Sequence, residues 1–502
     1  MLGFVRDVVL ARVFGVSGAT DAFFVAFRIP NLLRRLFAEG SFALAFVPVL
    51  NEIKASGDRE RLKGMVDAIA GTLLGALLVI TAIGVLAAPG VVTLFAPGFV
   101  DDAAQFEMAS GLLRITFPYI LFISLAGFCG AILNSFGRFA VPALTPVLLN
   151  LSLIAAALWL APRLAVPVYA LAWGVLIAGA AQLSAQLMAL ARMGMVPRPR
   201  WGWRTPEVKK VIKLMIPTLL GSSAAQINIL IDTIIATVIA VGSVSWLYYS
   251  DRLLEFPLGV FGIALATVIL PSLSSQHASG DAKAFSHTLD WALRTAMLIA
   301  IPACAGLIIV AGPIVTTLFG YGEFSAADIE MTTISVAAYA LGLPAFVAIK
   351  VIAPSFFARQ DAVTPVRISL IAMGANVVMN LGFVATMVHL DYPAPHAGLA
   401  LSSSLAAYLN AGLLYRAMRR SNSYTPGAGW GVYVLRVAFA LAMMVTALYF
   451  VPSDWIGVDL SAVDRATHLA GVLVMAGLAW FGGLLLVGWR FSELARSESA
   501  IS

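Results

Sequence analysis

Charged residues are scarce in this chain. They make up 12% of its 502 residues, whereas 60% of the residues are hydrophobic and the mean hydropathy is +0.92. Soluble domains carry about 25% charged residues. The scarcity extends along the whole chain, which excludes a soluble multidomain enzyme and indicates a polytopic membrane protein. The net charge of +6 would suit nucleic acid, but the basic residues follow a membrane pattern described below, so we expect no nucleic-acid partner.

Residue patterns that support catalysis or metal binding are also missing. Cys129 and Cys304 both lie in apolar runs, and two cysteines cannot form a disulfide framework or a metal cluster. The five histidines lack ligand spacing, and no G-x-x-x-x-G-K-[ST] loop for a nucleotide occurs. The pair Asp101-Asp102 is best interpreted as a solvated acidic loop, because the loops on its side are too short for a catalytic domain. We therefore expect no metal, no cofactor and no enzymatic activity.

Long apolar segments separated by short polar breaks fill almost the whole sequence. A transmembrane helix needs about 20 residues, and the pattern predicts about fourteen helices. They lie near 1–15, 20–53, 65–96, 107–136, 142–161, 167–191, 207–240, 244–276, 285–319, 327–357, 363–388, 396–418, 429–451 and 466–489. The longest should tilt, project from the membrane or kink at proline. The prolines concerned are Pro30, Pro118, Pro257 and Pro344. The first segment is too short to span, so we expect the natural chain to begin upstream of Met1.

Basic residues gather on one side of the predicted membrane. Most of the 32 Lys and Arg residues lie after even-numbered helices, and only Arg163 and Arg465 lie in the other set of loops. Acidic residues such as Asp391 and Asp454 collect on that second side. Loops rich in Lys and Arg stay in the cytoplasm. The bias therefore predicts that both termini are cytoplasmic.

The sequence repeats itself at a spacing of 223 to 224 residues. "VPVLNEIKASGD" at 47–58 matches "LPSLSSQHASGD" at 270–281, and "VTLFAPGF" at 92–99 resembles "TTLFGYGEF" at 316–324. The spacing holds six predicted helices, an even number, so the two repeats run parallel across the membrane. The repeat predicts an all-α, V-shaped transporter of two six-helix lobes plus two C-terminal helices, with its substrate site between the lobes.

The repeat also sets the expected limits of the parts of the chain. We expect an N-terminal lobe at 1–191 with a truncated first helix, a cytoplasmic linker at 192–206, a C-terminal lobe at 207–420 and the two additional helices at 429–490. Trp201 within the linker sequence suits anchorage at the membrane interface rather than nucleic-acid binding.

Charged residues inside predicted helices mark the candidate site, because such residues are costly in lipid and usually face a polar cavity or each other. "NLLRRLFAEGSF" holds Arg34 and Arg35 side by side. Arg34 shares a helical face with Asn31 and small residues, which suits the wall of a wet cavity. Arg35 shares its face with Glu39 at i+4 and can pair with it. We therefore predict a functional role for Arg34 and a structural role for Arg35.

Two further charge clusters lie in other predicted helices. Asp7 can pair with Arg6 or with a neighbouring helix. In "YYSDRLLEFPLG", Glu255 stands at i+3 from Arg252 and at i+4 from Asp251, so this cluster is either functional or purely structural.

Arginine predominates among the intramembrane charges near the N-terminus. In the first two predicted helices, counted up to Glu39, five arginines face three acidic residues. Guanidinium groups stay charged, are weakly hydrated and form two hydrogen bonds to phosphate oxygens at once. The excess of arginine predicts a cavity for an anion, whereas a cation exporter would need a buried carboxylate.

Long stretches of the chain closely resemble the MurJ/MviN family of bacterial lipid II flippases, within the multidrug/oligosaccharidyl-lipid/polysaccharide exporter superfamily. They include "LGFVRDVVLARVFG", "TDAFFVAFRIPNLLRRLFAEGSFALAFVPVL" and "SVSWLYYSDRLLEFPLGVFGIALATVILPSLS". The resemblance implies fourteen helices in the inner membrane and transport of undecaprenyl-pyrophosphate-linked disaccharide-pentapeptide, lipid II, for peptidoglycan synthesis and cell shape. Family members have about half a helix more before "LGFVRD", with one further cavity arginine.

The resemblance also assigns roles to individual residues. It implies substrate-binding arginines at Arg6, Arg34 and Arg252, and a groove for the lipid tail at the last two helices. The supporting charged and polar residues implied are Asp7, Asp21, Asn31, Glu39, Asp251 and Glu255. Expected partners are lipid II, membrane lipids and the cell-wall synthesis machinery. Two alternatives remain open: an exporter of O-antigen or capsule units on the same lipid carrier, and a membrane enzyme acting on polyprenyl phosphates, which the short outer loops disfavour.

Overall fold

The structure, a computed structural model, describes residues 2–34, 42–452 and 455–490 and holds only helices and connecting segments there. Nine helices within these ranges are long and apolar enough to cross a membrane, or ten if α15 and α16, bent by 40°, form one span. In the part of the chain that the structure describes, every predicted apolar segment coincides with one helix or with consecutive helices, so the predicted all-α membrane architecture is confirmed.

The chain divides by its contacts into two compact units, Met1–Ser245 and Trp246–Ser502. The helices in the first unit are α1 (Leu2–Phe14), α2 (Gly18–Arg34), α3 (Phe42–Ala55), α4 (Arg59–Leu86), α5 (Ala88–Phe95), η2 (Pro97–Phe99), α6 (Ala103–Thr116), α7 (Tyr119–Ser135), α8 (Ala140–Ala155), η3 (Ala156–Leu160), η4 (Ala161–Arg163), α9 (Tyr169–Ala191) and α10 (Pro206–Ile239). Helix α11 (Ser243–Pro257) starts in the first unit and continues in the second.

The second unit holds the remaining helices. They are η5 (Leu258–Gly262), α12 (Ile263–Ala278), α13 (Ala282–Ile309), α14 (Ala311–Phe319), α15 (Ala326–Ala340), α16 (Leu343–Ala358), α17 (Val363–His389), α18 (Ala397–Arg420), α19 (Trp430–Tyr449) and α20 (Ala462–Leu486). The contacts group α10 with the first unit, because it packs on α3. The lobe limits read from the repeat, with a linker at 192–206, stay predictions.

Breaks in the long helices fall at three of the four prolines expected to kink them. Pro118 separates α6 from α7, α11 ends at Pro257, and Pro344 stands in the first turn of α16 after the 40° bend. A proline lacks the N–H that would bond to the carbonyl four residues earlier, so a helix tends to break or bend there. Pro30 lies inside α2.

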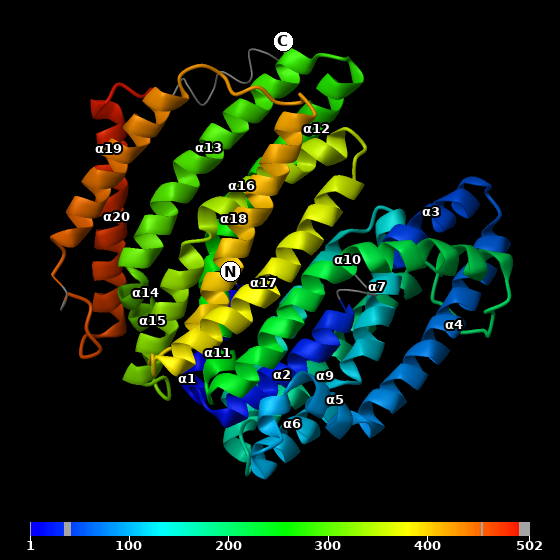
Figure 1. Ribbon diagram of the computed structural model, residues 1–502. Helices are drawn as coiled ribbons and strands as arrows, with labels where there is room; N and C mark the ends of the chain where they lie inside the picture. Colours follow the sequence, from blue (N-terminus) through cyan, green and yellow to red (C-terminus); the bar gives the residue numbers. More distant parts are fainter. Residues whose placement is uncertain (1, 35–41, 453–454, 491–502) are drawn as a thin grey trace. The chain divides into compact units, whose positions relative to one another are not determined.

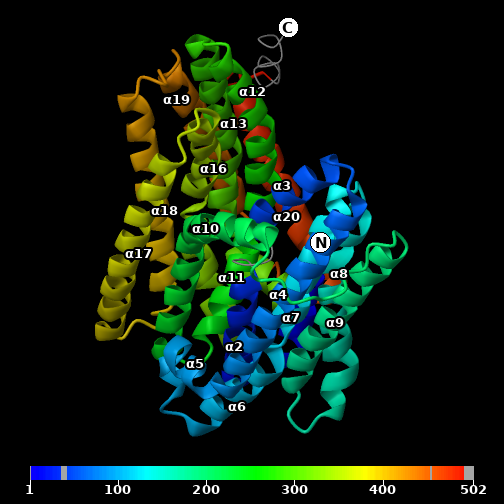
Figure 2. The ribbon, with the colours of Figure 1, turned by 90° about the vertical axis from the view of Figure 1, so that its right-hand side faces the viewer.

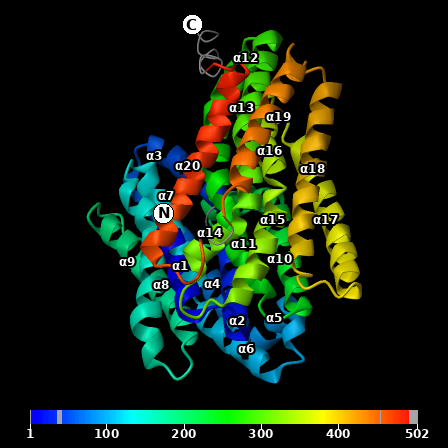
Figure 3. The same cartoon turned by 90° about the vertical axis from the view of Figure 1, so that its left-hand side faces the viewer.

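Aromatic packing fills the core of the first unit. Phe46 lies 5.2 Å from Phe128 and 5.3 Å from Phe42, measured between ring centres, and all three rings are buried. Helices α4, α7 and α9 run side by side (Figure 2), and α8 lies between α9 and α1 (Figure 3). The charged residues of α1 and α2 are therefore carried by helices that pack into a single bundle.

The second unit has two apolar cores on either side of α13. One joins α13 to α12, α16 and α18 through residues such as Leu289, Val351 and Leu414. The other joins it to α19 and α20 through Leu298, Met444 and Trp480. Figure 1 shows α19 and α20 side by side, next to α13. The two C-terminal helices are thus packed onto the second unit.

The repeated "ASGD" motif has a physical explanation in both units. Gly57 and Gly280 adopt φ of 76° and 74°, a left-handed conformation that glycine reaches without steric cost. The following residues, Asp58 and Asp281, accept a hydrogen bond from the backbone N–H three residues later and so cap α4 and α13. The motif therefore ends one helix and starts the next.

A second pair of aspartates, nine residues further on, anchors a strap in each unit. Asp67 on α4 accepts a 2.7 Å hydrogen bond from the Arg198 N–H, and Asp290 on α13 accepts one of 3.1 Å from the Gly427 N–H. Both carboxylates are buried. The straps are the segments that follow α9 and α18, so each aspartate ties the end of its unit's helix bundle back to a central helix.

The two anchors differ in how many donors they satisfy. Asp290 also accepts from the Tyr424 hydroxyl at 2.6 Å and the Trp430 indole N–H at 2.7 Å, and it pairs with Arg294 at 2.9 Å. Burial, together with this hydrogen bond to Asp290, raises the pKa of the Tyr424 phenol, which keeps it protonated as a donor. The second strap is thus held more firmly than the first.

We predict that Asp290→Ala destabilises the protein more than Asp67→Ala, because it leaves more buried donors without an acceptor, at about 1–3 kcal/mol for each. The measurement is thermal unfolding of each purified variant in detergent. Asp58→Ala, which removes only an exposed helix cap worth about 1 kcal/mol, is the control. If Asp290→Ala loses no more thermal stability than the control, the role of Asp290 in anchoring the strap is contradicted.

Candidate functional site

Arg6 and Asp7 form a buried ion pair on α1. The Arg6 Nε and Nη2 atoms donate to one Asp7 carboxylate oxygen at 2.9 and 2.7 Å, and Nη1 donates to the Asn150 side chain of α8 at 3.0 Å. Asp7 is 1% exposed and Arg6 8%. The pairing of Asp7 with its neighbour, one of the two options read from the sequence, is confirmed. Asn150 is a partner that the sequence analysis missed.

Arg34 stands at the C-terminal end of α2 and is partly buried. Its Nε donates to the Asn31 side-chain oxygen at 2.9 Å, which confirms that the two residues share a helical face. An amide carries no charge, so this contact orients the guanidinium without neutralising it. Arg35 and Glu39 lie outside the described residues, and their predicted pairing stays a prediction.

Asp21 fixes the start of α11. Its carboxylate accepts hydrogen bonds from the Gly242 N–H at 2.6 Å, the Ser245 N–H at 2.9 Å and the Ser245 hydroxyl at 2.6 Å. Negative charge is favoured at a helix N-terminus, where backbone N–H groups lack partners within the helix. Asp21 thus has a structural task, joining α2 to α11, that was not evident from the sequence. A role in a cavity stays a prediction.

Arg252 lies on α11 with a carboxylate and an aromatic ring beside it. Its Nη1 pairs with Glu255, as the i+3 spacing predicted, and its guanidinium lies 5.0 Å from the centre of the Tyr248 ring. The Glu255 side chain is 48% exposed. Asp251, the neighbouring acid, is partly buried. The contacts orient the guanidinium of Arg252, while Glu255 keeps access to water.

Arg28 offers a contrast to these groups. It donates through Nη1 to the Thr233 hydroxyl of α10, and Thr233 in turn donates to the Ile229 carbonyl. The contact joins α2 to α10 within the first unit. Arg28 was not among the predicted substrate-binding residues, and the structure gives it a neutral, helix-joining contact.

The three predicted arginines share a chemical arrangement suited to an oxyanion. Each is oriented by an oxygen atom, from Asp7 and Asn150, from Asn31 or from Glu255. A guanidinium carries five N–H donors in a planar fork, so groups oriented in this way can also bind phosphate oxygens. Within the described ranges, no group of three or more His, Cys, Asp or Glu side chains could hold a metal ion.

Comparison with known proteins assigns the chain to a family. The family model described as "Lipid II flippase MurJ" matches residues 10–461. A protein named probable lipid II flippase MurJ from Vibrio cholerae is 44% identical, and the match covers 98% of this chain and 94% of that protein. The chain belongs to the MurJ family of lipid II flippases. The resemblance stated from the sequence is therefore confirmed.

Further relatives support the same assignment. The lipid II flippase MurJ of Burkholderia cenocepacia is 40% identical over 98% of this chain and 96% of that protein. A solved structure of lipid II flippase MurJ in an inward closed conformation matches with a TM-score of 0.77 at 25% identity, over 96% of this chain and 97% of that one. An inward-facing multidrug transporter of the MATE family has a TM-score of 0.69 at 16% identity, over 84% of this chain and 94% of that one, and shows the shared fold alone.

We predict that Arg6→Ala lowers the amount of protein in the membrane, because it leaves Asp7 charged, buried and unpaired at a cost of about 3–5 kcal/mol. The double variant Arg6→Ala/Asp7→Ala removes both charges and should restore the protein level, but not activity. Immunoblotting of membranes reports the level, and rescue of cells depleted of their own lipid II flippase reports activity. If the double variant supports growth, Arg6 contributes only to packing.

Proposed function

We propose that this protein flips lipid II from the inner to the outer leaflet of the bacterial cytoplasmic membrane, which supplies the precursor for peptidoglycan synthesis. The observation that carries the proposal is the match of the MurJ family model over residues 10–461, supported by relatives of the same name over nearly the whole chain. The family consists of transporters, so the protein is a multi-pass membrane flippase and not an enzyme.

Arginine provides the physical means of moving a pyrophosphate through a membrane. A charged group cannot enter hydrocarbon without replacing its water of hydration. In the proposal, Arg6, Arg34 and Arg252 replace that water with charge-assisted hydrogen bonds, while the polyprenyl tail stays in lipid. The supporting residues are Asp7, Asp21, Asn31, Glu39, Asp251 and Glu255. Parallel-repeat transporters expose a site to each side of the membrane in turn by rocking their repeats.

The acidic partners of the arginines affect how the substrate binds at such a site. Asp7 and Glu255 hold Arg6 and Arg252 through carboxylate oxygens. A pyrophosphate presents oxygens of the same charge and similar geometry, so it can bind the same guanidinium groups, each of which carries five N–H donors. The arginines are thus oriented before the substrate arrives, and this lowers the entropy cost of binding.

Orientation and further partners complete the proposal. The concentration of Lys and Arg in one set of loops supports cytoplasmic N- and C-termini. The last two helices, α19 and α20, would accommodate the lipid tail, and enzymes of cell-wall synthesis on the outer side would receive the product. Within this scheme the protein needs no bound cofactor, since arginine and backbone groups supply the binding.

We predict that the chain restores growth to bacteria depleted of their lipid II flippase, and that Arg34→Lys and Arg252→Lys abolish this rescue at normal protein levels. Lysine keeps the charge but loses the planar pair of donors. Loss of one charge-assisted hydrogen bond, about 1.5–3 kcal/mol, should weaken lipid II binding about tenfold or more. Native mass spectrometry with lipid II measures the affinity.

Arg28→Lys is the matched control, because lysine can still donate to Thr233, and it should bind lipid II as the wild type does. Rescue of an O-antigen exporter mutant without rescue of the lipid II flippase mutant would reassign the substrate. If the protein binds an uncharged polyprenol as tightly as lipid II, it does not recognise the pyrophosphate.

A further inference from the structure

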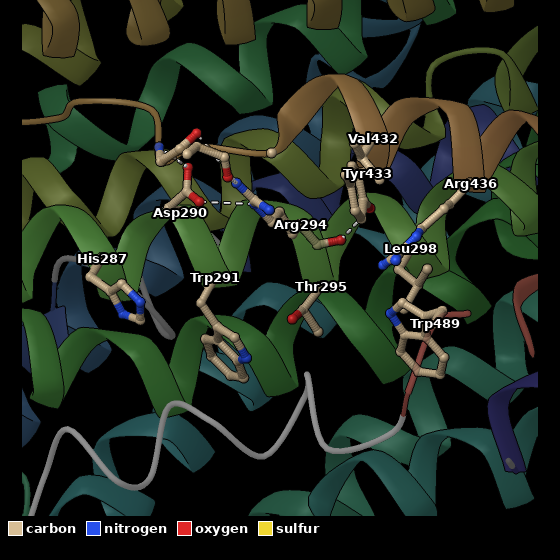
Figure 4. Close-up of a pocket in the computed structure, with 13 residues that line it drawn as sticks. His287, Asp290, Trp291, Arg294, Thr295, Leu298, Val432, Tyr433, Arg436 and Trp489 are labelled. Carbon is tan, nitrogen blue, oxygen red and sulfur yellow. Dashed lines mark hydrogen bonds and ion pairs between the residues drawn. The ribbon is translucent and has the colours of Figure 1, made fainter. Parts of the chain in front are cut away.

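A cavity of about 560 Å³ lies within the second unit. It is lined by the first half of α13, the strap at Gly427–Gly429, the start of α19 and Trp489 just after α20 (Figure 4). None of Arg6, Arg34 and Arg252 lines it. The cavity is therefore a separate feature of the molecule.

The position of the cavity along the helices places it at a membrane surface. Helices α13, α19 and α20 each have the length and composition of a membrane span. The cavity lies at the start of α13 and α19 and at the end of α20, so α20 runs antiparallel to the other two. Trp291, Tyr433 and Trp489 line it, and such aromatic side chains gather at the level of lipid headgroups.

The lining combines polar and apolar side chains. Asp290 and Arg294 lie nearer the start of α13, while Leu298 lies one turn further into the span. From His287 to Leu298 the lining follows α13 for about 16 Å, at 1.5 Å per residue. An occupant that fits this lining must offer both charged or polar groups and apolar groups.

The charge of the lining is positive. Two of the lining residues, Arg294 and Arg436, are positively charged, and one, Asp290, carries a carboxylate. Arg294 is oriented by its ion pair with Asp290, by a 2.9 Å hydrogen bond to the Ala428 carbonyl and by the Trp430 ring, 4.9 Å away. Figure 4 shows Arg436 projecting from α19 beside Trp489 and Leu298, at the deeper end. The lining residues thus include two arginines and one aspartate.

We propose that this cavity binds an anionic membrane phospholipid, with Arg294 and Arg436 contacting the phosphate and an acyl chain lying against Leu298 and Val432. Basic pockets between membrane helices are suited to phosphate headgroups. The bound lipid would touch α13, α19 and α20 together, and so would hold the two C-terminal helices on the second unit. The proposal does not depend on which substrate the protein transports.

The test is native mass spectrometry of the full chain with phosphatidylglycerol, with zwitterionic phosphatidylcholine and with inorganic phosphate. Wild-type protein should retain phosphatidylglycerol in preference to phosphatidylcholine, and Arg436→Gln should weaken that binding about tenfold. Val432→Glu is a second variant: Val432 is 54% exposed, so the change is compatible with folding, and its carboxylate should repel the phosphate. Arg420→Gln, at the exposed end of α18, is the matched control and should bind as the wild type does.

Each other outcome overturns the proposal. Equal retention of the two phospholipids would show that the cavity does not recognise the anionic headgroup. Binding of inorganic phosphate as tight as that of phosphatidylglycerol would show that the cavity does not recognise a lipid. Unchanged phosphatidylglycerol binding in both Arg436→Gln and Val432→Glu would place the lipid elsewhere. Displacement of phosphatidylglycerol by an equal amount of lipid II, lost in the same two variants, would make the cavity part of the transport route.

Discussion

A charge buried in a lipid-embedded helical protein must be balanced by hydrogen bonds or by an opposite charge, and much of this structure follows from that requirement. Asp7 is held by Arg6, Asp21 by the N–H groups that start α11, and Asp290 by three hydrogen-bond donors and its ion pair with Arg294. Arg465, also buried, donates to the Thr316 and Gly320 carbonyls at the end of α14. Each of these residues joins segments that lie far apart in the sequence or neutralises a neighbouring charge.

The buried aspartates and the predicted substrate-binding arginines therefore have different tasks. Asp21 and Asp67 accept from backbone N–H groups, which fixes helix ends and straps in place. The arginines are oriented by side-chain oxygens of Asp7, Asn31 and Glu255, and a guanidinium has five N–H donors with which it can also bind phosphate oxygens. Backbone anchors that fix the scaffold, together with arginines oriented for binding, suit transport of a phosphate-bearing lipid, because the scaffold stays folded while the site binds and releases its cargo.

Periodic features were predictable from the sequence, whereas contacts between distant segments were not. The length of the apolar runs predicted the helices, and the i+3 spacing predicted the Arg252–Glu255 ion pair. The shared face of Asn31 and Arg34 also followed from helical geometry. The strap anchors could have been found, since the repeat aligns Asp67 with Asp290. The partners Asn150 and Gly242 depend on tertiary packing, which no local pattern specifies.

The central claim is that oriented guanidinium groups carry the pyrophosphate, and transport by the purified protein tests it most directly. Lipid II is placed in vesicles with the protein, and a membrane-impermeant reagent added outside measures how much headgroup becomes accessible over time. The account predicts that the wild type exposes lipid II from the inner leaflet. A variant with lysine at Arg6, Arg34 and Arg252 should give the level of protein-free vesicles although it folds. Transport by that variant at the wild-type rate would contradict the account, because a diffuse positive field would then suffice.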